Sequence, residues 1–170
     1  GAAADLNTAY ASSGINNLGD EAVTLSDNSL AVSVLNTLDG RTSGAINASN
    51  INTLTGAAAD LNTAYTSAGI NGLGNEAVTL SDSSLAASVL NTLNDNTSGV
   101  INASSINTIS GSYADLNTAY TANANGSISG LGNEAVSVNS GTASTSQANT
   151  LAAATSGVVT ATLSDGDMAT

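Results

Sequence analysis

Carboxylates are the side chains of this sequence that could do chemistry, because the chain has thirteen acids, one basic residue, no cysteine and no histidine. Carboxylate oxygens are the ligands that Ca2+ prefers. The candidate calcium ligands, all near predicted loops, are Asp20, Glu21, Asp27, Glu76, Asp82, Glu134, Asp165 and Asp167. Their spacing fits no EF-hand loop, and asparagine replaces Asp20 at the two corresponding positions later in the chain. We therefore favour an interpretation in which these acids are solvated, cap helices and keep the protein soluble.

Catalysis by these carboxylates lacks the partners that it needs. Acid–base chemistry requires two carboxylates held in unlike environments inside a cleft. Glu21, Glu76 and Glu134 recur without a repeated basic or acidic partner that would tune them. Serine and threonine hydroxyls have no histidine or lysine to activate them. We predict that the protein is not an enzyme and has no cofactor, with calcium as the one alternative.

The net charge of -12 limits the partners that the protein can bind. Arg41 is the only basic residue, so no positive cluster can displace counterions from a phosphate backbone. We therefore predict no nucleic-acid partner. The longest apolar runs are only a few residues, which excludes insertion across a membrane.

An internal repeat organises the chain. The sequence GAAADLNTAY at residues 1–10 returns at residues 56–65 and, diverged, at residues 111–120. We predict one repeat domain over residues 1–170, with units 1–55, 56–110 and 111–170. Each unit splits into two halves, because the sequence Leu-Asn-Thr or its equivalent occurs twice in every unit. The asparagines of these anchors are Asn7, Asn36, Asn62, Asn91, Asn117 and Asn149.

Hydrophobic spacing predicts helices and short strands in alternation. Residues 30–38 and 56–65 place apolar side chains on one helical face, with Ser29 and Thr55 as candidate N-caps. Stretches that alternate apolar and polar residues predict strands with one buried face. The expected inward residues are Val23, Leu25, Ile46, Ala48, Val78, Leu80, Ile101, Ala103, Val136, Val138, Val159 and Ala161. The outward residues between them are threonine, serine and asparagine.

Strands separated by helices are expected to be parallel and joined by right-handed crossovers. The predicted fold is therefore an elongated α/β repeat solenoid with a parallel sheet, short helices and about six strand–helix layers. The alternative is an all-β solenoid in which the Ala-rich stretches are loops. A short motif that begins with isoleucine is expected to fill the corners of the core, and whether it adds strands stays open. Its copies begin at Ile15, Ile51, Ile70, Ile106 and Ile128.

Three other recurring features leave alternatives open. Asparagine is a poor residue for a helix interior, so the repeated asparagines either lie at the surface or bond the backbone of the next layer as a ladder. Tyr10, Tyr65 and Tyr120 recur once per unit, and we favour spacers at the edge of the core over a carbohydrate-binding row. Four Asn-x-Ser triplets would be glycosylation acceptors in a secreted protein. They begin at Asn47, Asn96, Asn102 and Asn125.

Three segments resemble tandem repeats in very large secreted or cell-surface proteins of cyanobacteria. They are GLGNEAVTLSD (residues 72–82), TSGVINAS (residues 97–104) and ADLNTAY (residues 59–65). The resemblance covers nearly the whole chain, implies an extracellular structural or adhesive role, and carries no catalytic residues. Some of those proteins also carry calcium-binding repeats of the type Gly-Gly-x-Gly-x-Asp, a motif that this sequence lacks.

The repeat and the resemblance together favour a structural function. We expect a repeat segment of an extracellular fibre, filament or surface-layer-like adhesive protein at the cell surface. Both ends of the sequence fall inside the repeat pattern, so we expect end-to-end self-association or continuation in a longer chain. The alternative is a binding module that presents a flat Thr/Ser/Asn strand face to a glycan, a mineral or ice. The mixture of residue types on that face argues against close matching to an ice lattice.

Overall fold

The computed structural model of the chain describes residues 1–164, which contain six helices and twelve strands. The helices are α1 (Ala3–Tyr10), α2 (Val32–Asp39), α3 (Ala58–Thr66), α4 (Ala87–Asn96), α5 (Tyr113–Asn125) and α6 (Thr145–Ala154). The strands are β1 (Val23–Thr24), β2 (Ser29–Ala31), β3 (Ile46–Asn47), β4 (Thr53–Gly56), β5 (Ile70–Asn71), β6 (Ala77–Leu80), β7 (Ser84–Ala86), β8 (Ile101–Asn102), β9 (Thr108–Gly111), β10 (Ile128–Ser129), β11 (Ala135–Ala143) and β12 (Val159–Leu163). We call one helix and the strands that follow it a coil.

The helices form at the Ala-rich and Leu-rich stretches, so the all-β alternative is wrong. The expected N-caps Ser29 and Thr55 belong instead to β2 and β4. The helices that follow begin after Ala31 and Ala57, and neither alanine provides a side-chain cap. The two helices therefore lie close to where the sequence predicts them. The polar residues before them, Ser29 and Thr55, lie in strands and do not cap the helices.

The strands form three sheets, and every strand pair is parallel. The orders are β1-β3-β5, β10-β8-β6-β4-β2 and β12-β11-β9-β7. This confirms an α/β fold with parallel strands, but with three sheets in place of the one expected.

The division into three sheets has a geometric cause. Four successive strand pairings of the longest sheet, from Leu30 to Ile128, advance 98 residues along the chain. Four successive helix intervals, from the anchor residue Leu6 to Leu116, advance 110 residues. A row of paired strands therefore drifts relative to the helices. The longest sheet begins with β2, directly before α2, and ends with β10, directly after α5.

The core consists of isoleucine, leucine, valine and alanine side chains from the inner faces of helices and strands. Most of the expected inward residues are buried, including Leu25, Ile46 and Ile101, each 0 % exposed. Val23, Val159 and Ala161 are only partly buried, because they lie in the first and last coils. The outward threonines Thr24 and Thr79 are exposed, as predicted, so the strand register was correct.

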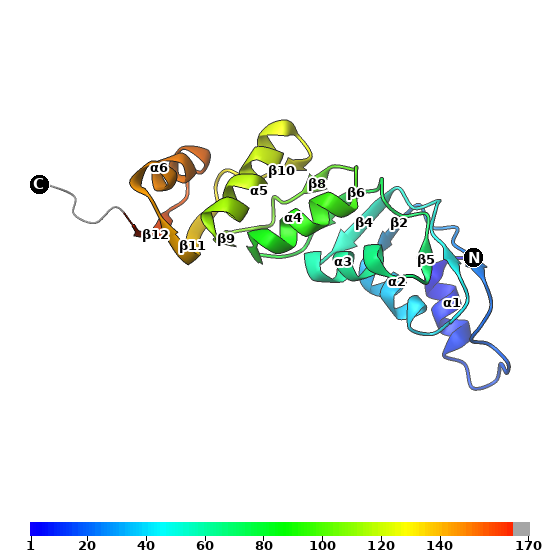
Figure 1. Ribbon diagram of the computed structural model, residues 1–170. Helices are drawn as coiled ribbons and strands as arrows, with labels where there is room; N and C mark the ends of the chain where they lie inside the picture. Colours follow the sequence, from blue (N-terminus) through cyan, green and yellow to red (C-terminus); the bar gives the residue numbers. More distant parts are fainter. Residues whose placement is uncertain (165–170) are drawn as a thin grey trace, which may run out of the picture.

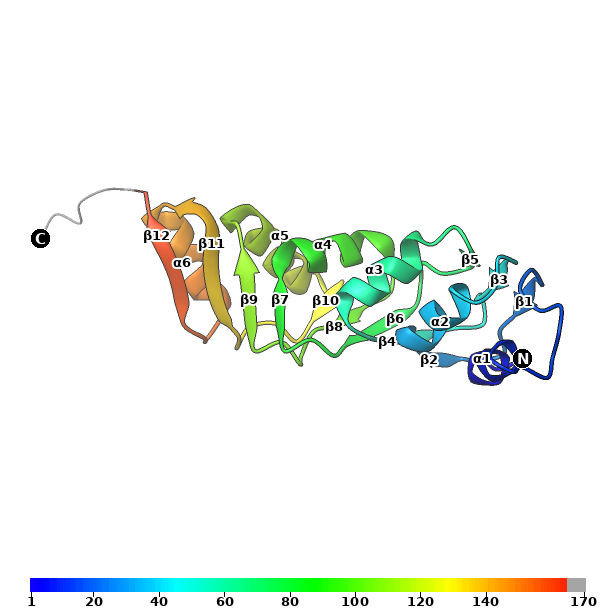
Figure 2. The same ribbon diagram turned by 90° about the horizontal axis from the view of Figure 1, so that it is seen from below.

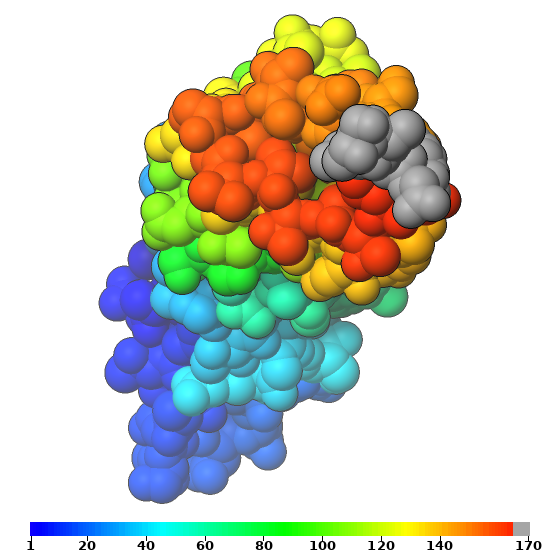
Figure 3. Space-filling view, turned by 90° about the vertical axis from the view of Figure 1, so that its left-hand side faces the viewer, coloured from blue at the N-terminus to red at the C-terminus, as the bar shows by residue number. Residues whose placement is uncertain are grey.

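Figure 1 shows an elongated molecule in which the helices follow one another from the N-terminal to the C-terminal end. Successive helices are in contact along this row, and the strands lie on its other side, as Figure 2 shows from below. In the end-on view of Figure 3 the first coil lies to one side of the last, so the coils are offset from one another. Among the described residues, no helix has both the length and the apolar character needed to cross a membrane.

Candidate functional site

The candidate calcium ligands do not converge within the described part of the chain. No three acidic side chains come together in residues 1–164 to form a group that could hold a metal ion. Asp20 is exposed in the loop before β1. Asp165 and Asp167 lie outside the described residues. The other candidates make specific contacts with the protein itself.

Two of these acids cap helices from a neighbouring segment of the chain. The Oδ2 atom of Asp27 accepts a hydrogen bond from the backbone N–H of Ala3, and Asp82 does the same for Ala58, each at 2.8 Å. Ala3 and Ala58 are the first residues of α1 and α3. A carboxylate is favourable at the positive end of the helix dipole. The capping expected of these acids is confirmed, although each acid follows its helix in the sequence. One strand lies between α1 and Asp27, and two lie between α3 and Asp82.

The three repeated glutamates turn inward, where each accepts a hydrogen bond from a tyrosine hydroxyl. The pairs are Tyr10–Glu21 (3.2 Å), Tyr65–Glu76 (3.1 Å) and Tyr120–Glu134. Backbone N–H groups two residues earlier also donate to these carboxylates, as from Gly74 and Gly132, both at 2.8 Å. Glu76 is 0 % exposed and Glu134 is 1 % exposed. The expectation that these acids are solvated is therefore wrong for the second and third units.

The next coil closes over each glutamate with the sequence Thr-Ser-Gly. In the second unit the hydroxyl of Thr97 donates to the backbone oxygen of Glu76 at 3.1 Å, and the N–H of Gly99 donates to that hydroxyl at 3.0 Å. A Cβ atom on Gly99 would lie 2.0 Å from the Glu76 oxygen, so no other residue fits there without a backbone shift. We call each set of four residues a glutamate clamp. The clamps are Tyr10–Glu21–Thr42–Gly44, Tyr65–Glu76–Thr97–Gly99 and Tyr120–Glu134–Thr155–Gly157.

The electrostatics of the clamps favour a structural contact over an acid–base pair. Burial raises the pKa of the Tyr65 hydroxyl, and the charge of Glu76 raises it further. Burial and the hydrogen bond to Glu134 raise the pKa of Tyr120 in the same way. The phenols of Tyr65 and Tyr120 therefore stay donors across the neutral range. In the first clamp, the backbone N–H of Gly19 is the largest cause that lowers the pKa of Glu21.

The repeated asparagines form the ladder that was one of the two alternatives. In four helices the side-chain Nδ2 donates to a backbone oxygen of the next helix, at 2.9 to 3.1 Å. The donor–acceptor pairs are Asn7–Val34, Asn36–Asp60, Asn62–Val89 and Asn91–Asp115. These bonds join the first five helices in series, from α1 to α5. They explain why asparagine recurs at a position that disfavours it.

The outward face of the strands carries polar side chains in register. Thr55 pairs with Thr79, Thr79 with Asn102, and Asn102 with Ser129. Neighbouring strands are about 4.8 Å apart, so these side chains form a regular row on the surface. A second row joins Thr24, Asn47 and Asn71.

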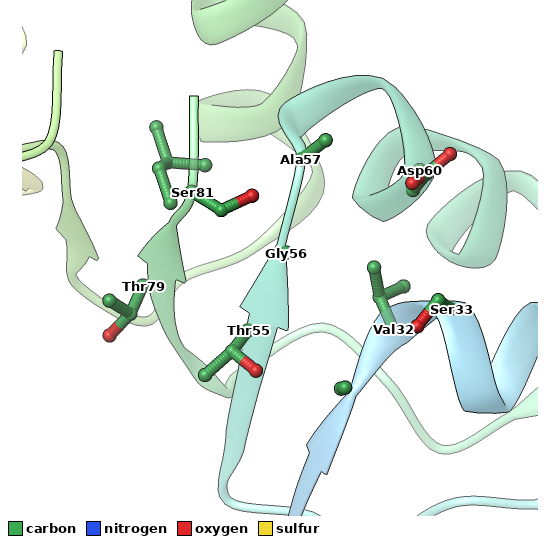
Figure 4. A pocket seen from close by; sticks show the side chains of 10 residues that line it. Val32, Ser33, Thr55, Gly56, Ala57, Asp60, Thr79 and Ser81 are labelled. Carbon is green, nitrogen blue, oxygen red and sulfur yellow. The ribbon is translucent and has the colours of Figure 1, made fainter. Parts of the chain in front are cut away.

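A hollow of about 370 Å3 lies where β2, β4 and β6 end and α2 and α3 begin (Figure 4). Thr55 and Thr79 lie on one side of it and Asp60 on the other. Gly56 lines it, and a Cβ atom there would lie 2.5 Å from Val32 Cγ1. The hollow offers hydroxyls and one carboxylate. No imidazole or lysine amine exists in this chain to activate a hydroxyl.

Comparison with protein-family models, curated proteins and solved structures finds no match. The functional argument therefore depends on the geometry of this chain.

Two of the glycosylation candidates, Asn47 and Asn102, are exposed on strands, and Asn125 is exposed at the end of α5. Asn96 instead donates its side-chain amide to Asn62 Oδ1 at 3.0 Å.

Sequence reasoning missed the glutamate clamps, although their signal is present. The glutamates recur once in every unit, at positions 21, 76 and 134. A tyrosine and a Thr-Ser-Gly sequence recur with them. Polar residues that recur together at the spacing of the full unit occupy equivalent places in each unit. Their joint recurrence is therefore evidence that they contact one another. The sequence prediction treated each residue type separately and so did not pair them.

Proposed function

We propose that this chain is a structural repeat segment, an elongated solenoid of about six strand–helix layers, in an extracellular fibre, filament or surface-layer-like adhesive protein. The observation that carries the proposal is the recurrence of equivalent contacts along the chain, with ladder bonds from α1 to α5 and one glutamate clamp in each unit. The asparagine ladder and the glutamate clamps each join adjacent coils through equivalent residues. A chain of this kind can be lengthened without new kinds of contact, which is what a spacer requires.

A role without catalysis or a cofactor is part of the proposal. The repeated glutamates accept hydrogen bonds from tyrosine hydroxyls and backbone N–H groups. Asp27 and Asp82 accept hydrogen bonds from the backbone N–H groups of Ala3 and Ala58 at the starts of α1 and α3. These contacts account for the glutamates, Asp27 and Asp82 without a metal. Adding calcium or a chelator should therefore leave the thermal unfolding midpoint unchanged, whereas a calcium-dependent rise would assign the metal a structural role.

The outside of the cell is the location that we propose, on the basis of the resemblance to secreted cyanobacterial repeats. The absence of cysteine and the single basic residue, which leaves few sites for trypsin, suit an exposed polymer. Antibodies raised against the chain should label intact cells that produce it. Labelling only after permeabilisation, under conditions that leave a cytoplasmic standard protected, would overturn this location.

The structural role is tested by changing the number of units. A variant in which residues 56–110 are duplicated should gain length in small-angle X-ray scattering while its cross-section stays the same. A variant that lacks residues 56–110 should shorten by the same amount, because the boundaries between units are equivalent. A compact particle, or loss of folding on duplication, would overturn the solenoid. Negative-stain imaging of native material would then separate a filament from an isolated particle.

A second candidate function is binding through the outward strand face. The in-register rows of threonine, asparagine and serine favour it, because they present hydroxyls and amides at a regular spacing. Thr79→Tyr would interrupt one row at an exposed position without touching the core. Thermal hysteresis, glycan arrays and mineral adsorption should then differ between the two proteins if this face binds a ligand.

A further inference from the structure

Apolar side chains whose counterparts in the inner coils are buried are exposed or only partly buried in the first and last coils of the described residues. Ile15 is 49 % exposed, whereas Ile70 and Ile128, its counterparts in the later units, are 8 % and 0 % exposed. At the other end Val159 is partly buried, whereas its counterpart Ile101 is 0 % exposed. A hollow of about 290 Å3 opens there beside α6 and β12, lined mainly by alanine, valine and leucine.

The two internal boundaries between units show what covers these residues. At the first boundary β3 pairs with β5, and at the second β8 pairs with β10. The backbone N–H groups of Ile101 and Ala103 donate to the oxygens of Ser127 and Ser129 at 2.9 and 2.8 Å. Strand β12 has the position in the third unit that β3 and β8 have in the first and second units. Residues 15–16 have the position in the first unit that β5 and β10 have in the second and third units, but they form no strand.

We propose that a second copy of this chain docks end to end, so that β12 of one copy pairs with residues 15–16 of the next. This inference rests on the proposed structural role and names its partner. By the internal template, the N–H groups of Val159 and Ala161 donate to the oxygens of Gly14 and Asn16 of the second copy. Pairing of this kind completes the edge of a parallel sheet.

The helices supply a second contact at the same joint. Asn36 and Asn91 donate across the two internal boundaries to the backbone oxygens of Asp60 and Asp115, both at 3.0 Å. The next asparagine of this series is Asn149, which is exposed on α6. In the docked pair it donates to the backbone oxygen of Asp5 in the second copy. Two independent contacts therefore specify a single register.

One residue makes this joint weaker than the internal ones. Gly72 has a φ of +87°, and a Cβ atom there would lie 2.9 Å from the backbone nitrogen of Ser49 in the preceding coil. The first unit has Asn17 at this position, with a φ of +62°. Its backbone already has the left-handed conformation, but its side chain obstructs the incoming strand. The joint is therefore reversible, and Asn17→Gly should tighten it by roughly tenfold, the effect of relieving such crowding.

Charge opposes the same joint, because each copy carries a net charge of -12. Salt screens this repulsion over about 10 Å at 0.1 M ionic strength. Association should therefore increase as salt is added. The increase should occur with monovalent salt alone, since no three acidic side chains of residues 1–164 converge to form a group that could hold a metal ion.

Cysteine cross-linking tests the register, because the natural chain has no cysteine. The template pairs Asn47 with Asn71 and Asn102 with Ser129, so it pairs Thr160 with Asn16 of the second copy. Directly paired strand residues are close enough for a disulfide. Full-length Asn16→Cys chains mixed with Thr160→Cys chains should give cross-linked dimers under mild oxidation. Neither variant alone should do so, and Val158→Cys, two residues out of register, should cross-link poorly with Asn16→Cys.

Sedimentation velocity of the full chain over a concentration series tests the association itself. Ile15→Glu should abolish it, whereas Val100→Glu should leave it intact, because Val100 is also 49 % exposed but lies in the middle of the molecule. Asn17→Gly should shift association to lower concentration. Equal effects of the two glutamate variants, or cross-linking independent of register, would overturn the docking. A monomer at every concentration and salt would also overturn it, while an elongated monomer in X-ray scattering would leave the structural role standing.

Discussion

The loop after α1 and the loop after α3 have nearly the same sequence but different structures. Residues 14–19 are GINNLG and residues 69–74 are GINGLG. In the second loop Ile70–Asn71 forms β5, which pairs with β3 of the preceding coil. In the first loop the corresponding residues form no strand, and Ile15 is exposed.

The difference shows that these short strands are made by their neighbours. An isoleucine and an asparagine have no intrinsic stability as a strand, and β-propensity depends on packing against adjacent strands. Where the preceding coil supplies a strand edge, the motif pairs and buries its isoleucine. Where the described chain supplies none, the corresponding residues Ile15 and Asn16 form no strand. Position in the stack therefore decides the structure of this segment.

The largest effect is expected from removing the isoleucine itself. Ile128→Ala should lower the free energy of unfolding by about 2 to 5 kcal/mol, because Ile128 is 0 % exposed and its removal leaves a cavity. Ile15→Ala should change it by less than about 0.5 kcal/mol, as at exposed positions. Urea unfolding of the monomer, followed by circular dichroism, compares the two. Similar losses would mean that the first loop is as well packed as the third.

Exchanging the residues that distinguish the loops tests the cause directly. Gly72→Asn gives the second loop the asparagine of the first, and its Cβ atom would crowd the backbone of Ser49. We expect a loss of about 1 to 3 kcal/mol, the usual result of overpacking. The N–H of Ala48, which donates to the Asn71 oxygen at 2.8 Å, should lose protection from hydrogen exchange. Unchanged protection would show that β5 tolerates the side chain. The reverse change, Asn17→Gly, is the control and should have little effect on the monomer.

A smaller effect is expected along the asparagine ladder. Asn91→Ala removes the bond to the backbone oxygen of Asp115 and should destabilise the protein by about 1 kcal/mol, the typical value of one hydrogen bond. Asn149 is exposed on α6, so Asn149→Ala should be nearly neutral in the monomer. The midpoints of urea unfolding compare the two variants. Equal losses would mean that the ladder contributes nothing beyond helix propensity.

Much of the fold could be predicted from the sequence because the signals were periodic. The internal repeat, the helical faces and the alternating strands predicted parallel strands between helices, with residues such as Leu25 and Ile101 inside. The three sheets could not be predicted, because they result from the mismatch between strand and helix intervals. The exposure of Ile15 could not be predicted from its motif either, since the isoleucine of a nearly identical motif, Ile70, is buried in the second unit.

The polar interior was the harder part of the prediction. For the acids as a group, including Asp27 and Asp82, helix capping was one of the roles expected, and these two aspartates do cap α1 and α3. Glu76 and Glu134 were not recognised as buried, because glutamate is rarely buried without a partner. Their partners are tyrosine hydroxyls and backbone N–H groups, and the backbone groups leave no trace in residue types. Contacts with the main chain depend on the fold and follow only after it is known.

Titration distinguishes the clamps at opposite ends of the pH range. At the alkaline end, burial raises the pKa of Tyr65 above its unfolded value of about 10. The stability from this shift is fully present below that value and is lost as pH rises through the folded pKa. The advantage of the natural protein over Tyr65→Phe should therefore shrink in strong alkali. Unfolding midpoints of the two proteins at increasing pH measure this, and a constant gap would mean that the phenol is accessible to solvent.

The smallest effect is expected from the first clamp at the acid end. The N–H of Gly19 lowers the pKa of Glu21 from its ordinary value of 4.5. A lowered folded pKa contributes stability above that ordinary value, and this contribution is lost as pH falls through the folded pKa. Glu21 lies partly exposed beside the open end of the stack, so water weakens the contribution. Glu21→Gln should therefore unfold slightly more easily than the natural protein near neutral pH and equally easily in acid. A difference that persists in acid would show that the Glu21 side chain acts through packing, as a buried clamp would, and would remove the distinction between the first unit and the later ones.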